Sequence, residues 1–199
     1  MNKFESNKQE NKEGKYFYGD ESTIYKNIKR KYGYSKKGNR CFGTFNHFNK
    51  TKVNVMATLT IDKTVVDNIS NFKSKIKSPD GLSINFRGKK EIRCIHTFTD
   101  NCNAKRFEYY VEHILLPEMD PGDTFIIDNA SYHKSQKIQY LINSKGCRIL
   151  YLPPYSPDLN PIENTWALLK SKLAKMDITL YNLDEFEKII IETLKTIYK

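Results

Sequence analysis

Apolar residues along the chain recur at strand-like and helix-like spacings, and the order of these segments predicts an α/β fold. Segments rich in β-branched and aromatic residues are predicted to be strands at residues 16–20, 53–60, 92–98, 124–128 and 148–152. A helical pattern separates the last two of these strands. They are therefore expected to pair in parallel through a right-handed connection.

Two predicted helices flank the strand at 124–128. The first begins after Asn103 and is bounded by Pro117, and the second spans 135–145, with Gly146 suited to its C-terminal cap. The residues expected to face the sheet are Phe107, Tyr110, Val111, Ile114 and Leu115 in the first helix and Ile138, Leu141 and Ile142 in the second.

Two more helices are predicted toward the C-terminal end. Pro161 suits the first turn of one, and Asn182 with Glu185 has the capping-box spacing that starts the other. Their expected buried stripes are Ile162, Trp166, Leu169, Leu173 and Met176, and Leu183, Phe186, Ile190, Leu194 and Ile197.

The remaining segments are polar. Residues 1–15 are mostly Lys, Asn and Glu and are predicted to form a disordered tail, because they carry too little apolar area to offset the entropy of ordering. Residues 26–40 are basic and read as a loop or hairpin. Residues 62–90 contain one turn signal, Ser78-Pro79-Asp80-Gly81, and no clear element. Residues 16–199 are therefore taken as one folded domain.

The charge of the chain points to a polyanionic partner. The 199 residues carry a formal net charge of +10, which favours nucleic acid, although coding-sequence bias toward Lys and Asn would also raise it. Apolar runs are too short for a membrane span, and residues 1–15 lack a secretion signal. An intracellular protein with four free thiols is expected; Cys94-Ile95-His96 with Cys102 lacks the fourth ligand of a usual zinc site.

Three acids carry the main functional signal. Asp128 ends a predicted buried strand, Glu163 lies in the first turn of a predicted helix 34 residues later (163 − 128 − 1), and Asp20 follows an aromatic strand. Two carboxylates about 5 Å apart repel by roughly 3 kcal/mol at an effective dielectric near 20. The nearest lysines are Lys134 and Lys170, so a divalent metal is the favoured counter-charge. Taken singly, each acid is equally consistent with a helix cap, a first-turn acid or a strand end.

Three sequence blocks resemble the Asp-Asp-Glu catalytic domain of mariner-type transposases and their bacterial insertion-sequence relatives. They are Gly19-Asp20-Glu21-Ser22, Ile127-Asp128-Asn129-Ala130 with His133, and the run PPYSPDLNPIENTW from Pro153 to Trp166. The likeness spans about residues 16–176. The last block is the most specific, because a long string at the expected distance from an Asp-Asn strand end is improbable by chance.

The resemblance implies a ribonuclease-H-like mixed five-stranded sheet flanked by helices, with the first strand central and the fourth beside it. It also implies that Asp20, Asp128 and Glu163 hold two Mg²⁺ or Mn²⁺ ions. The implied activity is cleavage of DNA phosphodiesters at element ends, followed by transfer of the freed 3′-hydroxyl into target DNA. Element ends and target DNA would be partners, together with a second copy of the chain in a homodimeric synaptic complex.

Several residues are weaker candidates for DNA contact or an accessory role. Asn129 belongs to the second block, and His133 is suited to contacting DNA or water at a metal site, or equally to a solvent-facing or capping role. The basic residues Lys29, Arg30, Lys31, Lys36 and Lys37 suit either DNA binding or a solvated face. Asp158 and Asn160 are expected to be turn and cap residues.

The family's helix-turn-helix DNA-binding region has no counterpart among the 19 residues before Asp20. A separately encoded recognition region is one explanation. The leading hypothesis is a transposase catalytic domain that acts at DNA in the cytoplasm, nucleoid or nucleus. The alternatives are a ribonuclease-H-like nuclease that cuts without joining, and an inactive DNA-binding fragment.

Overall fold

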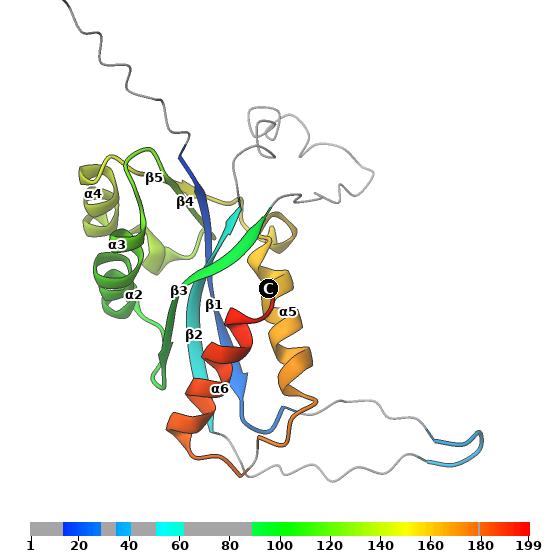
Figure 1. Cartoon of the computed structure of the whole chain (residues 1–199). Coiled ribbons are helices and arrows are strands. Elements are labelled where there is room, and N and C mark those ends of the chain that lie inside the picture. Colours follow the sequence, from blue (N-terminus) through cyan, green and yellow to red (C-terminus); the bar gives the residue numbers. More distant parts are fainter. Residues whose placement is uncertain (1–13, 29–34, 41–50, 62–88, 179) are drawn as a thin grey trace, which may run out of the picture.

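A mixed five-stranded sheet forms the centre of the molecule (Figure 1). The computed structural model describes residues 14–28, 35–40, 51–61, 89–178 and 180–199. The sheet has the strand order β3-β2-β1-β4-β5. The strands are β1 (Tyr16–Tyr25), β2 (Lys52–Ile61), β3 (Lys90–Phe98), β4 (Thr124–Ile127) and β5 (Arg148–Tyr151). All five predicted strands are present, and the predicted central position of the first strand, with the fourth beside it, is confirmed.

The pairing of the strands explains the mixed character of the sheet. Strand β1 pairs antiparallel with β2, which pairs antiparallel with β3, whereas β4 and β5 extend the sheet in parallel from β1. The predicted parallel pairing of the last two strands is therefore confirmed. The parallel pair needs a crossover connection, and helix α4 (Gln136–Ser144) makes it from β4 to β5.

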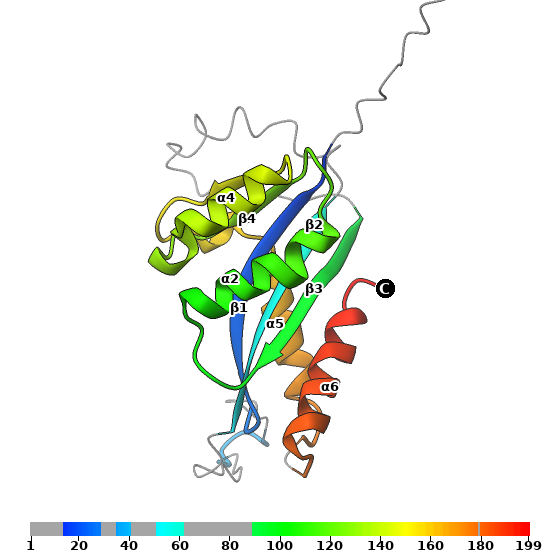
Figure 2. The same ribbon diagram turned by 90° about the vertical axis from the view of Figure 1, so that its left-hand side faces the viewer.

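Helices cover both faces of the sheet, so that it is the middle of three layers (Figures 1 and 2). One face carries α2 (Ala104–Tyr110), the π-helical stretch η3 (Val111–Leu115), α3 (Leu116–Glu118) and α4, and its core contains Phe17 and Phe125. The other face carries α5 (Ile162–Leu173) and α6 (Leu183–Lys195), with Tyr18 and Ile126 in its core. Successive residues of β1 thus enter opposite cores, as the two-residue repeat of a strand requires.

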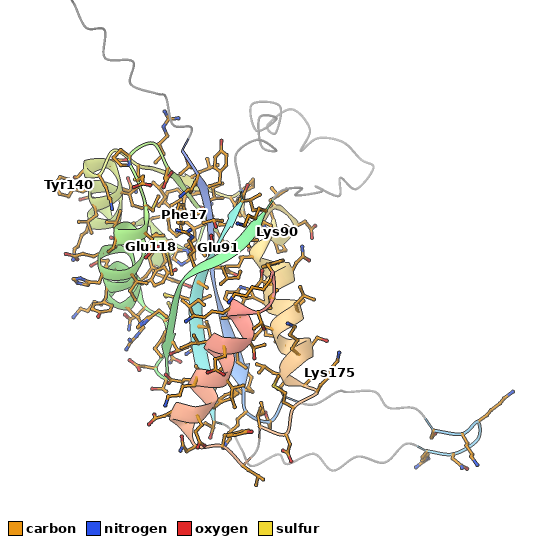
Figure 3. The ribbon with its side chains drawn as sticks, in the orientation of Figure 1. Phe17, Lys90, Glu91, Glu118, Tyr140 and Lys175 are labelled. Carbon is orange, nitrogen blue, oxygen red and sulfur yellow. The ribbon has the colours of Figure 1, made fainter. Side chains whose placement is uncertain are left out.

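Side chains fill the space between the layers, and the polar residues lie mainly outside (Figure 3). Phe17 is fully buried against the sheet, whereas Tyr140 on α4 is 71% exposed. No described helix is long and apolar enough to cross a membrane.

The predicted helices are present, with three corrections. Pro117 does not end the first helix, which continues to Glu118. Pro117 has no backbone N–H to donate within an α-helix, and a π-helical stretch replaces the α-helical hydrogen bonding directly before it. Met176 is 46% exposed because it lies beyond the last turn of α5. Leu183 is 37% exposed because it is the first residue of α6.

The predicted caps are confirmed. The Asn182 side chain accepts from the Glu185 backbone N–H, and the Glu185 carboxylate accepts from the Asn182 backbone N–H. Gly146 follows α4 with φ +73°, in the left-handed region that glycine enters at little cost.

Candidate active site

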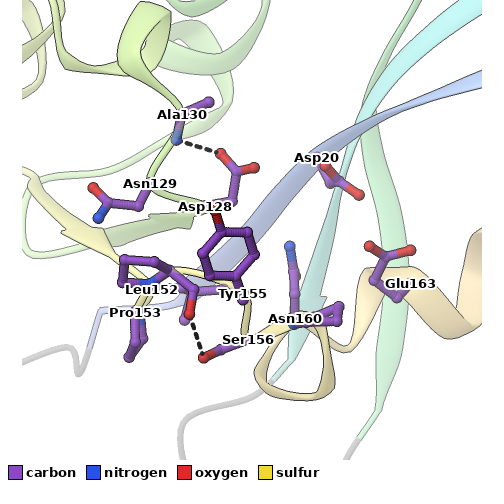
Figure 4. Close-up of a pocket in the computed structure, with 12 residues that line it drawn as sticks. Asp20, Asp128, Asn129, Ala130, Leu152, Pro153, Tyr155, Ser156, Asn160 and Glu163 are labelled. Atoms are coloured by element: carbon purple, nitrogen blue, oxygen red, sulfur yellow. Dashed lines mark hydrogen bonds between the residues drawn. The ribbon is translucent and has the colours of Figure 1, made fainter.

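A cavity of about 390 Å³ opens at the carboxyl ends of β4 and β5, beside the first turn of α5 (Figure 4). Its lining includes Asp20, Asp128 and Glu163. The three acids predicted from the sequence thus come from three distant segments of the chain to the wall of one cavity.

The register of the sheet explains the placement of Asp20. Tyr18 of β1 pairs with Ile126 of β4, and continuing this parallel register by two residues would set Asp20 level with Asp128. Because side chains alternate along a strand, Asp20 faces the same side as Tyr18, which is the side covered by α5. That helix carries Glu163.

Asp20 is the most strongly perturbed acid at the cavity. Burial, together with the negative charges of Glu21 and Glu163, raises the pKa of Asp20 to about 8. The indole Nε1 of Trp166 donates a hydrogen bond to Asp20 Oδ2 at 2.9 Å, which acts in the opposite direction. Trp166 is a core residue, as predicted, and its contact with Asp20 is an additional role that the apolar pattern did not reveal.

Asp128 is turned toward its own following segment. Its Oδ1 accepts a hydrogen bond from the Ala130 backbone N–H at 3.1 Å. The same oxygen lies 2.6 Å from His133 Nδ1, with which it forms a second hydrogen bond. The hydrogen bond with His133 lowers the pKa of Asp128, against the opposing effect of burial. The side chain of Asp128 is about half exposed, so its other face remains open to the cavity.

His133 supplies the positive charge that the sequence argument assigned to metal alone. Burial would lower the pKa of His133, but the Asp128 and Glu21 carboxylates raise it to about 9. His133 Nε2 lies 3.6 Å from Glu21 Oε2, an ion-pair distance longer than a hydrogen bond. Glu21 also accepts a hydrogen bond from the Tyr132 hydroxyl.

Two of the roles considered for His133 are therefore wrong. Its side chain is fully buried, so that it is neither solvent-facing nor placed to touch DNA directly. It packs beside Phe107 and Tyr132 under the cavity wall. Of the other candidates, Asn129 lines the cavity, Lys36 and Lys37 lie in an exposed turn, and Lys29, Arg30 and Lys31 lie outside the described residues.

Asn160 joins the loop before α5 to the central strand. Its Nδ2 donates to the backbone oxygen of Gly19 at 3.1 Å, and its own backbone oxygen accepts from the Glu163 N–H at 3.1 Å. A Cβ on Gly19 would lie 2.4 Å from the Phe125 ring, so only glycine fits at this point of β1. Asn160 is the C-cap of the 3-10 turn Pro157–Leu159, whereas Pro161 is the N-cap of α5. The side chain of Asn160 thus acts as a brace between the segments that carry Asp20 and Glu163.

The residues at the cavity fit a hard divalent cation. In the described part of the chain, no three His, Cys, Asp or Glu side chains lie close enough together to form a ready ligand set, because Asp128 is turned to His133. The donors at the cavity are nevertheless all oxygens, as Mg²⁺ and Mn²⁺ prefer. The buried Oδ1 of Asn160, which also lines the cavity, has no hydrogen-bond partner. The pKa of Asp20 is raised by burial first and then by the negative charges of Glu21 and Glu163, both of which a bound cation would oppose.

Removing the indole donor should weaken metal binding without unfolding the protein. Because Trp166 stabilises the ionised form of Asp20, we expect Trp166→Phe to raise the Mn²⁺ concentration for half-maximal Mn²⁺ binding about tenfold. Phe186→Leu, a buried change on α6, is the matched control for lost packing and should leave this concentration unchanged. An equal shift in both variants would contradict a specific role for the indole N–H.

Comparison with known proteins identifies relatives for most of the chain. The family model of the DDE superfamily endonucleases matches residues 83–186, just over half of the sequence. An uncharacterized protein of Sinorhizobium fredii, y4pE/y4sA, is 38% identical over 45 residues, which are 23% of this chain and 31% of that protein.

Solved structures resemble the fold over a larger range. The Mos1 strand transfer complex matches 91% of this chain at 19% identity with a TM-score of 0.59, and the Mos1 mariner paired end complex with Mn matches 91% at 18% identity, also with a TM-score of 0.59. The chain spans about half of each of those chains, 47% and 48%. These likenesses confirm the predicted ribonuclease-H-like fold.

Proposed function

The chain belongs to the DDE superfamily endonuclease family, and on that premise we propose that it is the catalytic domain of a DNA transposase. It cleaves DNA phosphodiesters in a metal-dependent reaction and joins the freed 3′-hydroxyl to target DNA. The observation that supports this most directly is the meeting of Asp20, Asp128 and Glu163 at one cavity. Burial and the charge of Glu163 disfavour the ionised form of Asp20, and a divalent cation at the cavity would offset that cost.

Asp20, Asp128 and Glu163 are the catalytic residues in this proposal and hold two Mg²⁺ or Mn²⁺ ions. Use of a divalent metal follows from the family, and the oxygen donors at the cavity support it. When bound, the metal supplies Lewis-acid stabilisation of the phosphate oxygens on which charge develops in the transition state. Glu163 lies in the first turn of α5, at the positive end of the helix dipole.

The surrounding residues hold these acids in place. Trp166 fixes one oxygen of Asp20, and Asn160 ties the loop before α5 to Gly19, next to Asp20. His133 forms an ion pair with the carboxylate of Asp128 and restrains it. The same imidazole also lies at ion-pair distance from Glu21. Rigid support of this kind matters because small displacements of catalytic groups cost large factors in rate.

The proposed partners are the element ends and target DNA. The net charge of +10 supports binding to the phosphate backbone. Residues 16–199 form the proposed catalytic domain, preceded by a polar tail at 1–15. Recognition of specific ends requires base contacts from another element, which we assign to a helix-turn-helix region outside residues 16–199. A homodimer would bring two ends together, one at each cavity.

A strand-transfer assay tests the proposal. The protein is incubated with Mn²⁺, supercoiled plasmid and a labelled duplex whose strand ends in a 3′-hydroxyl. We expect labelled duplex joined to plasmid, because one site serves both cleavage and joining. A duplex with a 3′-dideoxy end is the matched control and should give no joined product. Cutting of the plasmid without any joining would contradict the transposase proposal and favour the nuclease alternative.

A further inference from the structure

Tyr155 is an exposed aromatic residue at the rim of the cavity. Its side chain is completely exposed, at 102% of the reference area, yet the residue lines the same cavity as Asp128 and Glu163. In the view of Figure 4, its ring projects between Asp128 and Asn160. Among the described residues that line this cavity, Tyr155 is the one aromatic.

The backbone at Tyr155 is held in a conformation that a bulky residue seldom adopts. Its φ is +56°, in the left-handed region, in a turn that directly follows Pro153 and Pro154 and precedes Pro157. Glycine would satisfy this turn at lower cost. The ring contributes no burial that would compensate for the strain, since it is fully exposed. Strained residues of this kind cluster at sites of function.

We propose that the Tyr155 ring stacks on the nucleobase of an unpaired nucleotide next to the phosphate at the cavity. Every base offers a π-face, so an aromatic ring binds it with little sequence preference. A base inside a duplex has both faces covered by its neighbours, whereas an unpaired or extruded base leaves one free. The acids at the cavity repel phosphate in the absence of metal, so an uncharged aromatic contact is suited to holding the strand there.

This assignment deepens the proposed function and depends on it, because it names how the same cavity holds its DNA strand. It also explains why prolines flank the turn that carries Tyr155. Pro153, Pro154 and Pro157 restrict the backbone on both sides of Tyr155, so the Cα–Cβ bond from which the ring projects keeps its direction. A preorganised ring loses little conformational freedom when a base binds.

Fluorescence of 2-aminopurine tests the stacking directly. The probe is a short duplex with an unpaired overhang that carries 2-aminopurine, added to the full chain with Ca²⁺ so that binding is measured without turnover. We expect the wild-type protein to quench the fluorescence, and Tyr155→Ala to lose the quenching and bind the overhang about 5- to 150-fold more weakly. Tyr155→Phe should retain both, since stacking requires the ring and not the hydroxyl.

Two further variants separate stacking from stability. Tyr155→Gly relieves the backbone strain, so its thermal stability should not fall below that of Tyr155→Ala, while its quenching should be lost. Tyr140→Ala removes an exposed ring on the outer side of α4 and should leave quenching intact.

Quenching that persists in Tyr155→Ala, or a fully base-paired probe that quenches as strongly as the overhang, would overturn the inference. The quenching assay needs no cleavage, so it distinguishes the two proposals. If the protein joins DNA in the presence of metal but quenching does not depend on Tyr155, only the stacking proposal is wrong. If the strand-transfer assay gives no joined product, the transposase proposal is wrong.

Discussion

Asp128→Asn and Glu163→Gln should each lower Mn²⁺-dependent DNA cleavage by about 10³-fold or more. Each change removes one carboxylate charge at the cavity while keeping the size of the side chain. The charge on the phosphate in the transition state then loses its metal-borne stabilisation. We expect Asp20→Asn to behave in the same way. Cleavage of a labelled duplex, followed over time at saturating protein, is the measurement.

DNA binding should be nearly unchanged in these variants. Removing a negative charge from a DNA-facing cavity cannot weaken phosphate contacts made by lysines and arginines elsewhere. Asp158→Asn is the matched control, because Asp158 is an exposed acid in the same loop that does not line the cavity. Its cleavage rate should equal that of the wild type. A variant of Asp128 or Glu163 that cuts at the normal rate would show that this residue is not catalytic.

The order of strands and helices could be predicted from the sequence because each element has a regular apolar repeat. Strand β4 is a short apolar run with three buried residues, and α6 has a capping box followed by a helical stripe. The predicted ends of elements were less accurate where contacts with distant segments of the chain determine them. Strand β1 extends five residues beyond the predicted Asp20, because its partner β2 continues alongside it to Tyr25. No local pattern records that pairing.

The acids of the site could be predicted because they lie in recognisable strings, but their supporting residues could not. Glu21 and His133 approach each other across the sheet from segments far apart in the sequence. Nothing in either segment alone indicates the contact. One signal was available: Trp166 stands three residues after Glu163, on the same side of a helix, and a buried indole N–H usually finds a partner. Asp20 is that partner.

The orientation of Asp128 shows why charge counting along the sequence was insufficient. The sequence carries no Arg or Lys directly beside Asp128. The structure places the imidazole of His133 against it at 2.6 Å, and the carboxylates raise the pKa of that imidazole to about 9. A neutral histidine in the sequence thus becomes a cation in the fold. Asp20 has no such cationic partner among the described residues, which distinguishes the two aspartates electrostatically.

The metal-free protein should lose stability as the pH rises from about 4 to about 8, and divalent metal should reverse that loss. The folded pKa of Asp20, about 8, is above its unfolded value near 3.8, so between these values the folded state binds the extra proton. Stability therefore falls with rising pH across this window, by about 1 kcal/mol per pH unit. A bound cation replaces the proton, so the stabilisation by Mn²⁺ should be larger at pH 8 than at pH 6.

Thermal unfolding of wild type and Asp20→Asn, with EDTA and with Mn²⁺, separates this effect from other titrations. His133 acts in the same direction, since its pKa is raised to about 9 and its contribution is lost as the pH rises through that value. Asp128 has a lowered pKa, and its contribution is lost only in acid. Asp20→Asn should keep the pH dependence of stability that comes from His133 and lose the pH dependence that comes from Asp20. Its melting temperature in EDTA should therefore fall less between pH 6 and pH 8 than that of the wild type. Identical slopes in the two proteins would mean that Asp20 is ionised without metal, and the cavity would then need another source of counter-charge.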